Sequence, residues 1–152
     1  MNDKNVYCYK YPRPAYTADC IIFTEKSEYA EVVLIKRAFE PFKNYWAFPG
    51  GFVDINETGY DAAKRELLEE TGLKTDNLSE FGVFDTPGRD PRGRTVTVVY
   101  YTFNNEAAIN LIAGDDAAEV KLFSVKNLPE LAFDHKKILQ KAVNELIYNI
   151  QL

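Results

Sequence analysis

Residues 51–73 read GFVDINETGYDAAKRELLEETGL, and the spacing within this stretch predicts a helix over Gly59–Thr71. Thr58 is placed as the N-cap, with Asp61 three residues on as an acidic form of the capping-box partner. Gly72 follows the last turn and suits the left-handed residue that ends many helices. The chain therefore carries start and stop signals for one well-defined helix near its middle.

Three glutamates on this helix stand at positions i, i+3 and i+4: Glu66, Glu69 and Glu70. This spacing places them on one face, where like charges cost about 0.2 to 0.5 kcal/mol per pair. A hard cation such as Mg²⁺, which prefers carboxylate oxygens, phosphates and water, would relieve that repulsion. An acidic, solvated helix face explains the cluster equally well on spacing alone.

Extended segments rich in β-branched and aromatic residues are predicted on both sides of the helix. They cover residues 15–24, 31–38, 80–86, 95–103 and 119–125. The polar residues 24–28 predict a hairpin between the first two, and Pro49-Gly50-Gly51 predicts a backbone turn after the aromatic residues 39–48. Apolar residues at helical spacing predict a last helix over 134–149. This order favours an α/β fold with a mixed sheet and helices on its faces.

Length and composition indicate one globular domain, residues 1–152, without a membrane span or a signal peptide. The cytoplasm is the expected location. A net charge of -5 argues against non-specific nucleic-acid binding, which needs basic patches. Cys8 and Cys20 lack metal-ligand spacing, and Cys20 is expected to be a buried reduced thiol rather than half of a disulfide.

The segment 51–73 resembles the Nudix box, G-x5-E-x7-R-E-U-x-E-E-x-G-U, at all nine specified positions. The aromatic-Pro-Gly-Gly lead-in and the order of predicted elements are also similar to that family. The resemblance implies an α/β/α sandwich around a mixed sheet. It also implies hydrolysis of a pyrophosphate linkage in a nucleoside diphosphate compound, with Mg²⁺ as cofactor and Mn²⁺ as an alternative.

The resemblance also implies roles for individual residues. Glu66, Glu69 and Glu70 would ligate the metal together with the carbonyl oxygen of Gly50, and Gly51 would lie against the substrate. Glu57 and Arg65 would form an ion pair that orients the catalytic groups. The structural alternative for this pair is an ordinary salt bridge, which contributes little when exposed.

A general base is needed in addition to the metal. A glutamate of the box, Glu66 or Glu70, is one candidate. The acidic run Gly114–Glu119 is the other candidate, and it contains Asp115, Asp116 and Glu119. This run reads equally as a polar loop before a strand, so the base stays open at this point.

Residues 86–94 read TPGRDPRGR and place Arg89, Arg92 and Arg94 in one loop. Guanidinium groups bind phosphate through paired hydrogen bonds, so this loop is a candidate substrate clamp. A basic hairpin tip that pairs with surface carboxylates is the alternative. The loop and the segment Leu131-Ala132-Phe133-Asp134-His135 resemble the ADP-ribose pyrophosphatases and ADP-ribose-sensing regulators of the family. His135 itself is expected to be a capping or core-edge residue rather than a catalyst.

We therefore predict hydrolysis of ADP-ribose to AMP and ribose 5-phosphate. One alternative is a housecleaning nucleoside triphosphate pyrophosphohydrolase of the type that acts on oxidised deoxyguanosine triphosphate. The other is a non-catalytic ADP-ribose sensor. Two features count against a sensor: the set of box carboxylates is complete, and no residues are expected after the last helix for a winged helix. A homodimer formed through the tyrosine-rich residues 7–16 is also expected.

Overall fold

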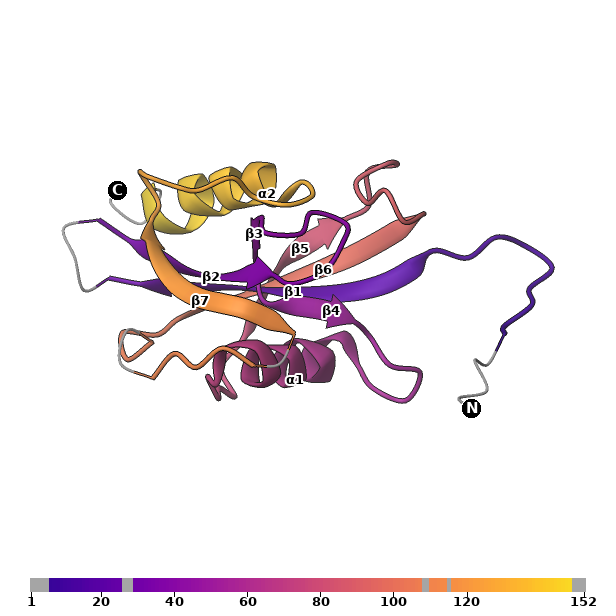
Figure 1. Ribbon diagram of the computed structural model, residues 1–152, viewed down its shortest axis with the longest axis horizontal. Coiled ribbons are helices and arrows are strands. Elements are labelled where there is room, and N and C mark those ends of the chain that lie inside the picture. The colour runs from indigo at the N-terminus through magenta and orange to yellow at the C-terminus, as the bar shows by residue number, and fades with distance from the viewer. Residues whose placement is uncertain (1–5, 26–28, 108–109, 115, 149–152) are drawn as a thin grey trace.

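The computed structural model describes residues 6–25, 29–107, 110–114 and 116–148. Seven strands form one sheet: β1 (Ala15–Thr24), β2 (Glu31–Arg37), β3 (Trp46–Ala47), β4 (Gly50–Phe52), β5 (Ser79–Phe84), β6 (Thr95–Phe103) and β7 (Ala117–Ser124). The helices are α1 (Gly59–Thr71) and α2 (His135–Ala142), and α2 continues as a π-helical turn, η1 (Val143–Tyr148). Figure 1 shows α1 and α2 on opposite faces of the sheet, so the predicted α/β/α sandwich is confirmed.

The sheet is mixed because β1 runs parallel to β6 and antiparallel to its other neighbours. One edge of β1 pairs with β6 along most of its length, from Ala15 to Phe23. The other edge is shared: its beginning pairs with β4, through Thr17 to Asp19, and its end pairs with β2. The sheet therefore divides between β2 and β4, and this division opens the site described below.

Side chains along β1 point alternately to the two faces of the sheet, so this strand contributes to both halves of the core. Ala18, Cys20 and Ile22 pack with α1, whereas Ile21 and Phe23 pack with α2. Cys20 is a free, fully buried thiol, as the sequence predicts. Its Sγ contacts the carbonyl oxygen of Ala63 at 3.4 Å. No helix in the described part of the chain is long and apolar enough to cross a membrane.

Helix α1 begins and ends at the predicted residues. The Thr58 side chain accepts a hydrogen bond from the amide of Asp61 at 3.1 Å, and Gly72 ends the helix at φ 73°. The five predicted strands are present as β1, β2, β5, β6 and β7, and the first hairpin is confirmed by the antiparallel pairing of β1 with β2, although residues 26–28 of the hairpin lie outside the described residues. The last helix follows the prediction as far as Tyr148 and includes the π-helical turn; residue 149 lies outside the described part.

The turn predicted at Pro49-Gly50-Gly51 is wrong, because Gly50 and Gly51 lie in strand β4 without a positive φ. Their lack of a side chain serves close approach instead. A Cβ atom on Gly50 would stand 2.3 Å from Oδ1 of Asp19, and one on Gly51 would stand 2.4 Å from Oε1 of Glu66. Glycine at these two positions therefore lets β4 lie directly against β1 and the glutamates of α1.

Candidate active site

Two glutamates of α1 face strand β4. Oε2 of Glu70 accepts a hydrogen bond from the amide of Gly50 at 2.8 Å, and the Glu66 carboxylate lies against Gly51. Burial raises the pKa of Glu70 to about 8, and the nearby charges of Glu66 and Asp19 add to the shift, while the Gly50 amide opposes it. Burial also raises the pKa of Glu66. The crowded carboxylates would be relieved by a cation.

Glu69 is more exposed than the other two glutamates. Its side chain is 57% exposed, and Oε2 is 3.3 Å from Nη1 of Arg65. Among the described residues, no group of three or more His, Cys, Asp or Glu side chains converges closely enough to hold a metal ion. The donor chemistry nevertheless fits a hard divalent cation, because Glu70 lies against Gly50, Glu66 lies against Gly51, and exposed Glu69 lines one hollow together with Glu70.

The ion pair between Glu57 and Arg65 is present. Nη2 of Arg65 lies 2.5 Å from Oε1 of Glu57 and Nε lies 3.1 Å from Oε2, which is a two-point contact. Arg65 also donates to the carbonyl oxygen of Phe52 and to Oε1 of Glu66, and Glu57 accepts from the amide of Asp54. The pair therefore joins the β4–α1 loop to the helix and holds one glutamate of the cluster.

The structure separates the two acidic candidates that lie after α1. Asp116 lines a hollow of about 280 Å³ together with Glu69, Glu70 and Gly114. Glu119 lies on β7 between the ammonium groups of Lys121 and Lys36, at 2.7 and 3.4 Å, and these contacts lower its pKa. Asp116 thus lies beside the glutamates and Glu119 serves a surface salt bridge; Asp115 lies outside the described residues.

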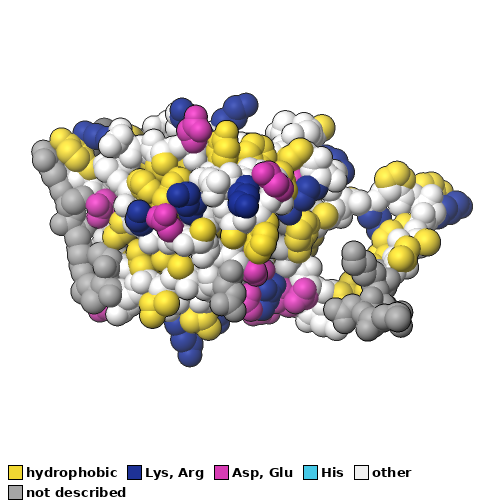
Figure 2. All heavy atoms as spheres, in the orientation of Figure 1, with side chains coloured by type: hydrophobic (Ala, Val, Ile, Leu, Met, Phe, Trp, Pro, Cys, Tyr) yellow, Lys and Arg dark blue, Asp and Glu magenta, His cyan; other side chains and the backbone are white. Residues whose placement is uncertain are grey.

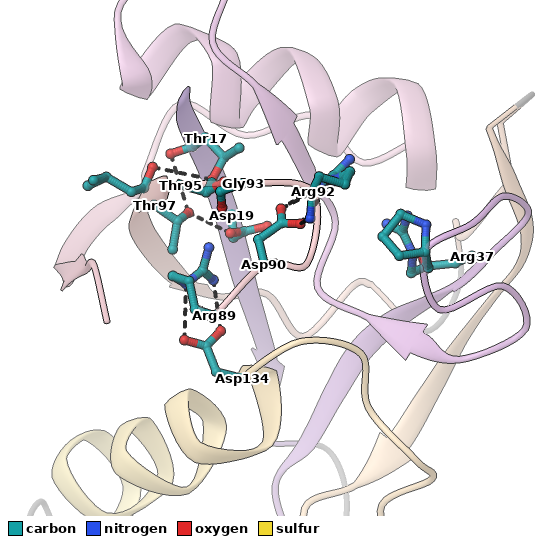
Figure 3. Close-up of polar contacts among 12 residues, drawn as sticks. Thr17, Asp19, Arg37, Arg89, Asp90, Arg92, Gly93, Thr95, Thr97 and Asp134 are labelled. Carbon is teal, nitrogen blue, oxygen red and sulfur yellow. Dashed lines mark hydrogen bonds and ion pairs between the residues drawn. The ribbon is translucent and has the colours of Figure 1, made fainter. Parts of the chain in front are cut away.

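The three arginines of the 86–94 loop have different surroundings. Arg89 is 4% exposed and binds Asp134 through two contacts, at 3.0 and 2.8 Å (Figure 3). Arg94 donates to the carbonyl oxygen of Asp85. Arg92 pairs with Asp90 and places its guanidinium carbon 4.9 Å from the ring centre of Phe52, with 41% of its side chain exposed. Arg92 and Arg94 are both exposed, but Arg94 does not line the cleft described next, so of the three only Arg92 combines exposure with a place in that cleft.

A cleft of about 100 Å³ joins these groups where the sheet divides. It is lined by Asp19, Arg37, Gly50, Glu70, Arg92 and Phe133, among others. Arg37, the last residue of β2, stacks over the ring of Phe133 at 4.9 Å, and burial together with the charge of Arg92 lowers its pKa. We refer to the hollow lined by these six residues as the cleft. In the neighbouring region of β4 and α1, Figure 2 shows acidic side chains gathered around basic ones.

Asp19 and Arg37 were not predicted as site residues from the sequence. Asp19 is 8% exposed, its Oδ2 accepts from Thr97 Oγ1 at 2.5 Å, and burial raises its pKa to about 6. An aspartate inside the apolar run ADCIIF was a signal, because a buried charge needs a specific reason. Arg37 gave a weaker signal, since a basic residue at the end of an apolar strand is common at the surface.

A carboxylate-bearing helix beside an arginine-lined cleft is the arrangement of an enzyme that acts on a phosphorus anhydride with a hard cation. The family model described as NUDIX domain matches residues 13–142, and the chain belongs to this family of hydrolases. The resemblance of residues 51–73 is thereby confirmed. Nudix hydrolases generally use divalent metal ions.

Similar proteins support the assignment. The chain is 45% identical to "ADP-ribose pyrophosphatase" from Methanocaldococcus jannaschii over 86% of this chain and 73% of the relative. It is 37% identical to "ADPR responsive transcriptional repressor NtrR" from Acinetobacter baylyi over 90% of this chain, but it spans only 56% of that repressor. The NUDIX domain of Shewanella oneidensis NrtR, solved with ADP ribose, superposes with a TM-score of 0.83 at 26% identity, covering 93% of this chain and 94% of that one.

Proposed function

We propose that this protein hydrolyses ADP-ribose to AMP and ribose 5-phosphate. The observation that carries the proposal is the position of Glu70 and Glu66, beside Gly50 and Gly51, at the mouth of a cleft that holds Arg92 and Arg37. The identity of 45% to an ADP-ribose pyrophosphatase supports the same substrate. In the reaction, water adds to one phosphorus atom, and the anhydride bond to the other phosphate breaks.

We further propose Mg²⁺ as the metal, held by Glu66, Glu69 and Glu70 with the carbonyl oxygen of Gly50. When bound there, the ion neutralises phosphate charge and makes a water molecule more acidic. The amide of Gly50 keeps Glu70 in place, and Arg65 keeps Glu66 in place. The ion pair of Arg65 with Glu57 fixes the loop in which the box begins.

The remaining groups of the chain bind the substrate and accept a proton. Arg92 is the proposed phosphate clamp, because it is exposed and oriented by Asp90 and the Phe52 ring. Gly51 lines the cleft and leaves room for the Glu66 carboxylate, and it is proposed to lie against the substrate. Asp116 and Glu66 are the proposed alternatives for the general base, and the contacts of Glu119 with two lysines make it the weakest of the predicted candidates.

A second candidate function is ADP-ribose sensing without catalysis, which the identity of 37% to a repressor favours. The full set of glutamates and the intact Glu57–Arg65 pair favour hydrolysis instead. A cytoplasmic location, a homodimer formed through residues 7–16 and the absence of nucleic-acid binding remain predictions. Tyr7, Tyr9 and Tyr11 of that segment are exposed, and Figure 1 shows the segment extending away from the sheet.

The test is turnover of ADP-ribose by the purified protein with Mg²⁺, with products separated by chromatography. Nucleoside triphosphates, NADH and dinucleoside polyphosphates form the comparison panel, and a chelator is the control for the metal. A higher kcat/KM for triphosphates than for ADP-ribose would support the housecleaning reading. Saturable ADP-ribose binding without turnover would support the sensor.

A further inference from the structure

Residues 48–50 lead from β3 into the first residue of β4, and the last of them carries the amide that holds Glu70. Pro49 has no N–H, and its carbonyl oxygen accepts from the amide of Cys20 at 2.8 Å. The amide of Gly50 donates to Oε2 of Glu70 at 2.8 Å. The position of Glu70 therefore depends on where residues 48–50 lie, and the amide of Phe48 is the remaining backbone donor of this segment.

His135 holds that donor. Nδ1 of His135 accepts a hydrogen bond from the amide of Phe48 at 3.1 Å, across 87 residues of sequence. The two rings also stack, with their centres 4.5 Å apart and an angle of 15° between their planes. His135 is 3% exposed, and burial lowers its pKa to about 3, so the ring is neutral and Nδ1 keeps a lone pair for the amide.

The neighbouring residue fixes His135 in turn. Asp134 directly precedes α2 and forms the two-point contact with buried Arg89, which ties the start of the helix to the 86–94 loop (Figure 3). The backbone of His135 is therefore held in place at the start of α2, and its Nδ1 points at the amide of Phe48.

We infer that His135 is a positioning residue of the active site: it holds the Phe48 amide and thereby sets where the Gly50 amide presents Glu70. This inference rests on the proposed function, because it assigns importance to the position of Glu70. His135 contacts no reacting atom in this assignment. It explains the histidine of the Leu-Ala-Phe-Asp-His segment without a catalytic role for that side chain.

Two substitutions separate hydrogen bonding from packing. In His135→Asn the amide oxygen is attached to Cγ, as Nδ1 is in histidine, so the acceptor is kept while ring volume is lost. In His135→Leu the volume is largely kept and the acceptor is lost. The matched control is Leu139→Ala, which removes buried packing from α2 and leaves the acceptor in place.

The first measurement is hydrogen exchange of the Phe48 amide in the metal-free proteins. We expect protection in the wild type, His135→Asn and Leu139→Ala, and faster exchange in His135→Leu. The second is kinetics with ADP-ribose at a temperature where all four proteins are folded. His135→Leu should lose about tenfold to a hundredfold in kcat, the scale of a displaced catalytic group, with KM within about threefold. His135→Asn should stay within about threefold of wild type in both.

The inference would be overturned if His135→Leu kept wild-type activity and wild-type protection of the Phe48 amide while His135→Asn was impaired. That result would show that the side chain at position 135 only fills space. Equal losses in all three variants would overturn it as well. A wild-type protein that does not turn over ADP-ribose contradicts the proposed function and not the contact, which the exchange rate of Phe48 decides independently.

Discussion

Replacing Arg89 by alanine should destabilise the protein, although the residue belongs to a loop that reads as a substrate clamp. Arg89 is 4% exposed and Asp134 is 19% exposed, and two charge-assisted hydrogen bonds join them. Alanine would leave the Asp134 carboxylate largely buried without its partner. A charge in that state costs far more than a surface ion pair contributes.

The expected size follows from the burial of both partners. Removing one side of a buried ion pair costs about 3 to 5 kcal/mol, and the remaining access of Asp134 to water places this case at the lower end, about 3 kcal/mol. For a chain of this length, that corresponds to a fall in Tm of about 6 to 12 °C. Replacing both residues with apolar side chains, as in Arg89→Met with Asp134→Leu, should recover much of the loss, because no charge is left unpaired.

Urea denaturation of wild type, Arg89→Ala and the double variant measures these free energies of unfolding. Arg94→Ala is the matched control from the same loop, and its exposed contact predicts a loss below about 1 kcal/mol. If Arg89→Ala is as stable as Arg94→Ala, the pair with Asp134 does not stabilise the fold, and the structural role given to Arg89 is wrong.

Three further predictions concern the site and stability in acid. Arg92→Ala should lower kcat/KM for ADP-ribose about tenfold to a hundredfold, with poor rescue by lysine; a change below twofold would remove Arg92 from the clamp. Glu70→Gln should lower kcat by about 10² or more and keep the fold, since burial already favours the neutral acid; near-normal kcat would exclude a ligand role. The pKa of His135 is about 3 in the fold against 6.5 for a free histidine, so its contribution to stability is full above pH 6.5 and is lost as the pH falls toward 3. The slope is at most about 1.4 kcal/mol per pH unit, and urea denaturation of His135→Asn should lack it; an unchanged slope would contradict the assignment.

Local signals in the sequence were enough to predict the central helix and its chemistry. The capping residues Thr58 and Gly72 act within a turn of the helix they bound, and the spacing of the glutamates alone places them on one face. Strand β6 follows its predicted limits, because alternation over nine residues is a strong local pattern. The motif in residues 51–73 has fixed spacing, so the family could also be inferred before any contact was known.

Pairings across the chain decided the rest. Strands β3 and β4 are two and three residues long, too short to carry a pattern of their own, and Gly50 is required by the approach of Asp19 rather than by a turn. Arg89 and Arg92 are chemically alike in the sequence, yet Arg89 is buried against Asp134 and Arg92 is 41% exposed. Charge and spacing set what these side chains can do, whereas the partner that each one meets depends on residues far away in the chain, and only the packed structure brings those together.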